Sequence, residues 1–340
     1  MTNKSERALI MSFAGALLCA LCTTAQAGLQ QGQDAYLDGD YKAALKELAP
    51  LATKGDVQAL YILGEMSEAG QGVPKDQKKA AERYLAAAKT GHVDAQFKIA
   101  LMYAAGTGVK QDEQQAVSWY LKAAGQGHPE AQLALAQMHA SGKGVANDAQ
   151  QAAVWYRKAA EYGNVDAQYR MGVMSTNGQG VPRDAEEAVS WFIKAAEQGH
   201  IEAQFNLGQI YREAKTPDYT KSLMWYWKAA DSGYAPAQYN LGLMYRQGVG
   251  AVQDYKTALF LLRKAAAQNQ AAALLALGEM YARGEGVNKD AVQSYKWLKL
   301  ASFSGLAEAD VKLKEIEKSL DPKQIKEGDV QALQWRSQHK

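Results

Sequence analysis

The stretch Trp119–Gln132, WYLKAAGQGHPEAQ, decides the fold because the chain repeats it. Residues 155–168 read WYRKAAEYGNVDAQ, and residues 191–204 read WFIKAAEQGHIEAQ. Successive copies start 36 residues apart. A fixed period of about 20 to 50 residues is the signature of a repeat array, in which each unit packs against its neighbours. The pattern therefore predicts one stacked array.

One residue marks the turn of every unit. It is glycine at Gly55, Gly91, Gly127, Gly163, Gly199, Gly233 and Gly305, and asparagine at Asn269. An alanine stands four residues after each of these turn positions, and alanine or serine stands eleven residues before it. Agreement over eight registers predicts an array of about seven to eight repeats.

Each unit is expected to form two helices, and we number positions from the turn residue. Apolar and small residues at −11, −10, −8, −7, −4 and −3 share one face at 100° per residue, which predicts a first helix before the turn. Recurring Ala-Gln, Leu-Gly and Met-Tyr pairs after the turn predict a second helix. A glycine inside a helix costs about 1 kcal/mol relative to alanine. The recurrence of Gly208, Gly242 and Gly278 therefore indicates close backbone contact with the first helix.

The loops between units carry predicted helix caps. Five loops read Gly-x-Gly-Val, and an aspartate stands three residues after each valine. A carboxylate just before a helix can accept a hydrogen bond from a free backbone N–H of the first turn. We therefore expect these residues to cap the next first helix: Asp76, Asp112, Asp148, Asp184 and Asp290. The turn glycine suits the left-handed conformation in which many helices end.

The composition fits a folded chain without a nucleic-acid partner. Of the 340 residues, 47% are hydrophobic and 22% are charged, and the formal net charge is +2. A disordered chain would hold too few apolar residues to offset its conformational entropy. A nucleic-acid-binding chain would usually carry a clear basic excess.

Residues 1–27 are expected to be a secretory signal peptide. Lys4 and Arg7 precede an apolar run over residues 8–22, and residues 25–27 have the small-x-small pattern of a cleavage site. We expect cleavage after Ala27, with a retained anchor as the alternative. Both cysteines lie within the apolar run, so the mature chain would have no disulfide. After cleavage we expect no stable membrane insertion.

These residues resemble the Sel1-like repeat family, whose units are similar to tetratricopeptide repeats with a longer, glycine-bearing loop. The resemblance implies an all-α, right-handed α-solenoid of helix-turn-helix repeats over residues 28–305, with its first helix from about residue 34. It also implies capping helices and a tail over residues 306–340. Many bacterial relatives are exported and bind proteins, so the resemblance implies a periplasmic protein.

The sequence contains no arrangement typical of a catalytic or metal site. His92, His128 and His200 share one repeat position, and equivalent points of stacked helix pairs lie about 10 Å apart or more. That spacing prevents joint metal ligation and indicates a structural role. His-Glu-x-x-His, phosphate-loop and Gly-x-Ser-x-Gly motifs are missing. We therefore expect a non-enzymatic protein with no catalytic residue, no metal and no cofactor.

The variable positions of the first helices form the predicted binding site. Positions −9 and −6 point away from the core face, toward the concave surface in tetratricopeptide-like stacks. The candidates are Leu121, Val154, Arg157, Ile193, Met224, Trp227, Phe260 and Arg263. Lysines at position −5 would surround an apolar patch, and such patches often mark partner sites. The alternative is packing against a neighbouring helix, although Trp225-Tyr226-Trp227 cannot place all three rings on one helix face.

We therefore expect an exported scaffold that binds a partner protein on its concave face. The resemblance suggests two roles, either an immunity protein that neutralises a type VI secretion effector or an adaptor of cell-envelope machinery. The rival hypothesis is a cell-envelope enzyme or ligand-binding protein acting on peptidoglycan fragments or β-lactams. That activity would require a pocket with convergent polar groups.

Overall fold

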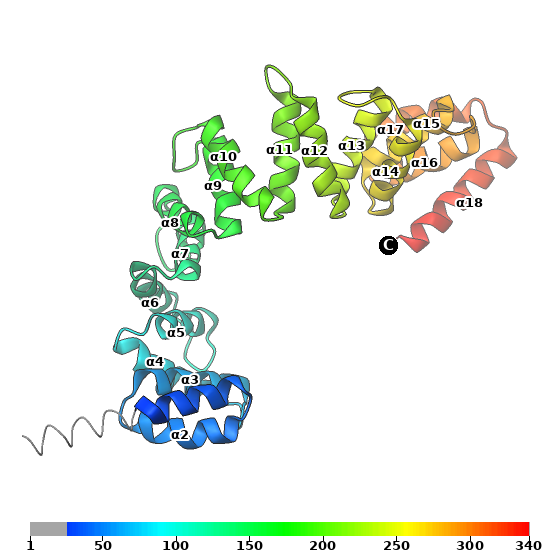
Figure 1. Cartoon of the computed structure of the whole chain (residues 1–340). Coiled ribbons are helices and arrows are strands. Elements are labelled where there is room, and N and C mark those ends of the chain that lie inside the picture. Colours follow the sequence, from blue (N-terminus) through cyan, green and yellow to red (C-terminus); the bar gives the residue numbers. More distant parts are fainter. Residues whose placement is uncertain (1–25, 340) are drawn as a thin grey trace, which may run out of the picture. The chain divides into compact units, whose positions relative to one another are not determined.

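A computed structural model describes residues 26–339, and all regular structure in this range is helical. The chain divides into two compact units. Unit 1 runs up to Ala167 and includes Asn177–Arg183, whereas unit 2 comprises Gln168–Thr176 and Asp184–Lys340. Within each unit, consecutive helices pack as helical hairpins (Figure 1). The predicted signal peptide lies outside the described residues, apart from its last two positions.

The helix bounds follow the predicted period. The first helices are α2 (Tyr41–Thr53), α4 (Gln77–Lys89), α6 (Glu113–Gly125), α8 (Ala149–Glu161), α10 (Ala185–Glu197), α12 (Tyr219–Asp231), α14 (Tyr255–Ala267) and α16 (Ala291–Phe303). The second helices are α3 (Val57–Ala69), α5 (Val93–Ala105), α7 (Pro129–Ser141), α9 (Val165–Asn177), α11 (Ile201–Glu213), α13 (Ala235–Gln247), α15 (Ala271–Arg283) and α17 (Ala307–Glu317). A final helix, α18, spans Pro322–Gln338. The predicted all-α array of helix pairs is confirmed.

The N-terminal end of the array differs from the expected start near residue 34. The described chain is already helical over residues 26–37, and Asp40 caps α2 after a short turn. This early helix forms because Leu29 and Tyr36 pack against the buried side chains of α2, including Leu48. Gly32 permits the approach, since a Cβ there would lie 2.6 Å from Leu48. The array therefore begins one helix earlier than the repeat pattern indicates.

Turns and caps have the predicted chemistry. Each turn glycine has a positive φ, and Asn269 is the one non-glycine residue with a positive φ in the described chain. All five predicted aspartate caps are confirmed; Asp76, for example, accepts a hydrogen bond from the Lys79 N–H at 3.0 Å. Asp218 caps α12 in the same way, although the loop before it lacks both glycines. The caps fix where every first helix begins.

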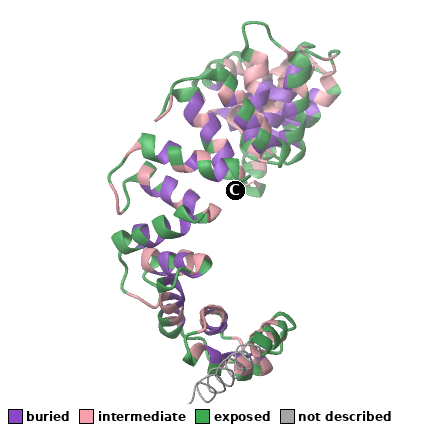
Figure 2. Ribbon diagram, turned by 60° about the vertical axis from the view of Figure 1, so that its left-hand side comes forward, coloured by how far each residue is buried: buried purple, intermediate pink, exposed green. Residues whose placement is uncertain are grey.

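The helix glycines make room for a side chain, which refines the expected backbone contact. A Cβ on Gly208 would lie 2.5 Å from the ring of Tyr226, a fully buried residue of the following first helix. The corresponding distances are 2.9 Å from Gly242 to Leu262 and 2.7 Å from Gly278 to Leu298. Each glycine therefore accommodates the residue at position −7 of the next repeat. Buried residues accordingly concentrate where helices face one another (Figure 2).

The C-terminal helix α18 closes unit 2. It begins with a capping box. The Asp321 side chain accepts hydrogen bonds from backbone N–H groups of the first turn, and the Asp321 N–H donates one to the Gln324 side chain. Gly328 faces the Tyr295 ring, and Trp335 packs edge-on against Trp297 with ring centroids 5.7 Å apart. The helix α18 thus packs against α16 and covers its Tyr295 and Trp297 side chains. No helix in the described range is long and apolar enough to cross a membrane.

The seating of Tyr226 on Gly208 makes a stability prediction. Gly208→Ala should lower the free energy of unfolding by about 1–3 kcal/mol, because the overpacking penalty exceeds the gain in helix propensity. Gly125→Ala is the matched control, since a Cβ there meets no atom within 4 Å. The control should be neutral or slightly stabilising. Urea unfolding followed by circular dichroism measures both, and equal behaviour of the two variants would contradict the packing constraint.

Candidate functional site

The predicted binding residues project from the first helices. The Trp225-Tyr226-Trp227 triplet separates as predicted, because Trp225 and Tyr226 are buried whereas Trp227 is 42% exposed. Phe260 is 56% exposed one repeat later. Leu121, Val154, Met224 and Arg263 are also exposed, and Arg157 and Ile193 are half-buried. Most of these side chains therefore lie outside the core and are accessible to solvent.

The two units hold different members of this set. Leu121, Val154 and Arg157 belong to unit 1, and the other five belong to unit 2. In unit 2, four residues occupy positions −9 and −6 of the consecutive first helices α12 and α14. We call them the Trp227 patch: Met224, Trp227, Phe260 and Arg263. Ile193 has the same repeat position on α10.

Tyrosines of the second helices hold the patch in place. The Trp227 Nε1–H donates a hydrogen bond to the Tyr245 hydroxyl at 3.2 Å. An Arg263 guanidinium N–H donates one to the Tyr281 hydroxyl at 2.6 Å. These tyrosines were not assigned to the site from the sequence. The recurrence of the Met-Tyr pair in the second helices is the pattern that could have indicated them. The two contacts restrain exposed side chains, which reduces the entropy that binding would cost.

Buried or half-buried tryptophans position the surrounding lysines. In four first helices the lysine ammonium at position −5 lies over the tryptophan ring at position −8. The pairs are Lys122 on Trp119, Lys158 on Trp155, Lys194 on Trp191 and Lys228 on Trp225, at 3.8 to 4.2 Å from the ring centroids. Lys264 lies over Phe260 at 4.6 Å instead. These cation–π contacts explain the recurrence of lysine at this position.

The repeated histidines stabilise second-helix N-termini. The Nδ1 atom of His92 accepts a hydrogen bond from the Ala95 N–H at 3.2 Å, and its ring stacks on Tyr61 at 4.6 Å. His128 and His200 make the same two kinds of contact. Their structural role is therefore confirmed. No cluster of three or more side chains suited to a metal ion occurs within residues 26–339.

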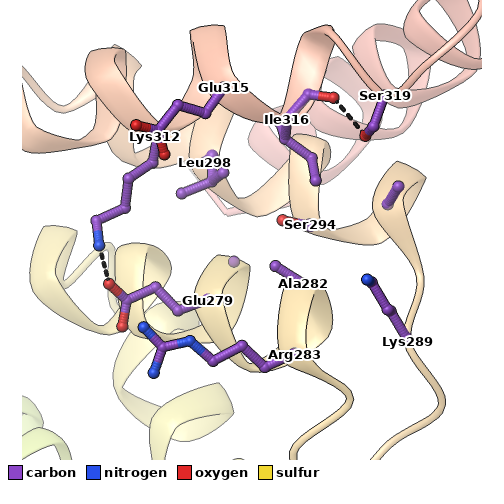
Figure 3. Close-up of a pocket in the computed structure, with 12 residues that line it drawn as sticks. Glu279, Ala282, Arg283, Lys289, Ser294, Leu298, Lys312, Glu315, Ile316 and Ser319 are labelled. Atoms are coloured by element: carbon purple, nitrogen blue, oxygen red, sulfur yellow. Dashed lines mark hydrogen bonds and ion pairs between the residues drawn. The ribbon is translucent and has the colours of Figure 1, made fainter.

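A groove in unit 2 is the place to test the enzyme hypothesis. It lies between α15, α16 and α17, with a cavity volume of about 470 Å³, and Figure 3 shows Glu279 ion-paired with Lys312 at its edge. The Ser294 hydroxyl is buried there without a hydrogen-bond partner. The residues lining the groove include no histidine or cysteine that could act with Ser294. Unit 1 has a similar groove lined by Ala104, Lys143 and neighbouring residues, so the feature follows from stacking the repeats.

A buried ion-pair network borders this groove. Arg246 donates hydrogen bonds to Glu279 at 2.8 Å and to Glu285 at 2.6 Å, and its side chain is 11% exposed. Burial by itself raises the pKa of Glu279, but hydrogen bonds from Lys312 and Arg246 outweigh this effect and hold the pKa below its usual range. Glu279 thus links α13, α15 and α17 and serves the structure of unit 2.

Stacked helix pairs with exposed variable residues on the first helices define a helical-repeat protein. The family model described as Sel1 repeat matches residues 57–92, 93–128, 129–164, 165–200, 201–234, 235–270 and 271–302. The chain therefore belongs to the Sel1 repeat family, whose members are protein-interaction scaffolds. No curated protein matches it.

Three solved structures illustrate the relationship. A Sel1 repeat protein from Oxalobacter formigenes is 31% identical, with 70% of this chain and 96% of that chain covered and a TM-score of 0.57. The protective antigen c5321 of uropathogenic Escherichia coli is 26% identical, with coverages of 93% and 92% and a TM-score of 0.45. The immunity protein Pa5087 from Pseudomonas aeruginosa is 23% identical, with coverages of 64% and 82% and a TM-score of 0.34.

The network around Glu279 makes a pH-dependent prediction. Glu279→Gln should lower the free energy of unfolding by about 2–3 kcal/mol at pH 7, because it removes one of the two carboxylates that balance the buried Arg246, and with it the shorter ion pair of Lys312. A lowered folded-state pKa stabilises the protein above the unfolded-state value of 4.5, and this stabilisation is lost as pH falls through the folded-state pKa. The difference between wild type and variant should therefore shrink in acid. Glu315→Gln, at an exposed site, is the control; a pH-independent difference would contradict the assignment.

Proposed function

We propose that this protein is a non-enzymatic, exported scaffold that binds a partner protein through its first helices, with the Trp227 patch at the centre. One observation carries the proposal: Met224, Trp227 and Phe260 stay exposed at positions −9 and −6 of two consecutive first helices, whereas the residues at positions −7, −4 and −3 of the same helices are buried. Trp and Arg are favoured anchors of protein interfaces, and exposed apolar groups surrounded by polar ones often mark partner sites. Ile193 is a further candidate in unit 2, and Leu121, Val154 and Arg157 are the corresponding candidates of unit 1.

The biological role belongs to one of two kinds. The protein either neutralises a toxic secreted effector, as an immunity protein would, or connects components of the cell envelope. Both roles need a rigid surface of restrained side chains, and the hydrogen bonds from Trp227 and Arg263 to tyrosines supply that restraint. The groove beside Ser294 is not part of this proposal, because the carboxylate of Glu279 at its edge already pairs with Lys312 and Arg246.

Replacing Trp227 tests the binding site. Trp227→Glu should leave the helical content unchanged, because the side chain is outside the core, and should weaken partner binding by at least about 2 kcal/mol. The partner is first captured from periplasmic extract with the tagged wild-type protein and identified by mass spectrometry. Its affinity for both proteins is then measured by calorimetry.

Val311→Glu is the matched control, since Val311 is an exposed apolar residue on α17 outside the patch. It should bind the partner like the wild type. A variant at Trp227 that fails to fold would show that the residue belongs to the core. Undiminished binding by a folded variant would exclude the patch.

Export is tested separately at the N-terminus. The protein expressed with its own first 27 residues should appear in the periplasmic fraction and begin at Gly28, because cleavage is expected after Ala27. Removal of these residues should keep it in the cytoplasm. Intact-mass measurement after cell fractionation reads both outcomes, and a full-length protein in the membrane fraction would support a retained anchor.

A further inference from the structure

Charge is unevenly distributed along the first helices of unit 2. Helices α12, α14 and α16 together carry seven basic residues and one acidic residue, Asp231. The basic residues are Lys221, Lys228, Lys256, Arg263, Lys264, Lys296 and Lys299. By contrast, α10 has three glutamates and one lysine. The small net charge of the chain therefore conceals a strongly basic set of helices.

Five of these seven basic residues make no ion pair in the described part of the chain, and apart from Lys256, in the first turn of α14, they occupy positions −9, −6 and −5 of the first helices. Lys221 pairs with Asp218 and Lys299 with Asp329, at 3.2 and 3.3 Å. Within the described residues, no acidic side chain lies at ion-pair distance from Lys228, Arg263, Lys264 or Lys296. Lys228 and Lys264 instead lie over aromatic rings, and Arg263 donates to the neutral Tyr281 hydroxyl. We call these four residues the basic border.

The basic border is continuous with the Trp227 patch. Lys228 stands four residues after Met224 on the same face of α12, Arg263 is part of the patch, and Lys264 lies over the Phe260 ring. Arg263 and Lys296 are close enough to repel each other, since burial and then the charge of Arg263 lower the pKa of Lys296. Like charges on neighbouring helices α14 and α16 cost free energy, and a bound anion would remove that cost.

We propose that the Trp227 patch and the basic border together bind an acidic peptide segment that carries large apolar side chains. This inference rests on the proposed function and adds the chemistry of the partner. Carboxylates of the segment pair with the basic border, and its apolar side chains cover Met224, Trp227 and Phe260. A surface of one charge sign also speeds association with a partner of the opposite sign.

Labelled model peptides test the proposal on the full mature chain. The probe is a fluorescein-labelled peptide of three Glu-Asp-Leu-Phe units, and binding is followed by fluorescence anisotropy. One matched peptide has lysine in place of every acid, and another has serine in place of every Leu and Phe. The acidic apolar peptide should bind at least about tenfold more tightly than either, and binding should weaken between about 50 and 500 mM NaCl.

Variants locate the interaction. The double variant Lys264→Glu, Lys296→Glu should bind the acidic apolar peptide at least about tenfold more weakly, because two attractive charges become repulsive. Lys314→Glu, Lys318→Glu, which changes two exposed lysines at the end of α17, is the control and should bind like the wild type. Equal losses in both double variants would overturn the proposal.

Other outcomes separate this inference from the proposed function. If the acidic and lysine peptides bind equally and Trp227→Ala weakens both, the patch binds apolar groups and the charge inference is wrong. If Trp227→Ala leaves binding of the acidic peptide unchanged, the proposed binding site itself fails. A single-stranded oligonucleotide of equal charge that binds as tightly as the acidic peptide would also overturn the proposal, because it would indicate a general polyanion site.

Discussion

The seating of one large side chain on one small residue governs the stacking of this array. Every second helix except α17 has glycine or alanine nine residues after the turn, where the next first helix presents Tyr, Phe or Leu at position −7. Gly64, Gly172 and Gly208 show the geometry clearly, since a Cβ at each would lie within 2.7 Å of an aromatic ring. Because the contact is between consecutive repeats, it transmits order from each helix pair to the next.

This way of filling the core leaves the outward positions free to differ. Buried small residues at positions −4 and −3, the large side chain at −7 and the aspartate caps are similar in nearly every repeat, so they carry structure and little specificity. Positions −9 and −6 vary from Ser118 to Phe260 and from Arg157 to Trp227. In unit 2 they combine exposed aromatic side chains with unbalanced positive charge. A repeat protein can thus build a specific surface without disturbing its stacking.

Much of the fold could be predicted from the sequence because its determinants are local. The period placed every turn, and the aspartate after each Gly-x-Gly-Val loop placed the start of the next first helix. The capping helix α18 could be expected from the residues around Asp321 and Pro322. The start of the array could not, because the helix over residues 26–37 lacks the repeat pattern and is held by packing against Leu48.

The candidate site was less accessible to sequence reasoning because it depends on distances between repeats. Helix periodicity separated Trp227 from Trp225 and Tyr226, but the hydrogen bond from Trp227 to Tyr245 joins residues 18 positions apart on different helices. The total charge of +2 gave no sign of the basic border. Only the pairing of Lys221 with Asp218 and of Lys299 with Asp329 shows which cations remain unbalanced.

Site-specific photo-crosslinking in the living cell tests the central claim most directly, namely that this surface is where the partner binds. A benzophenone amino acid would replace Phe260 in one strain and Val311, on α17, in another, and both strains would be irradiated. The account predicts one discrete adduct from position 260 and none from position 311. Adducts only from position 311, or the same adducts from both positions, would contradict it.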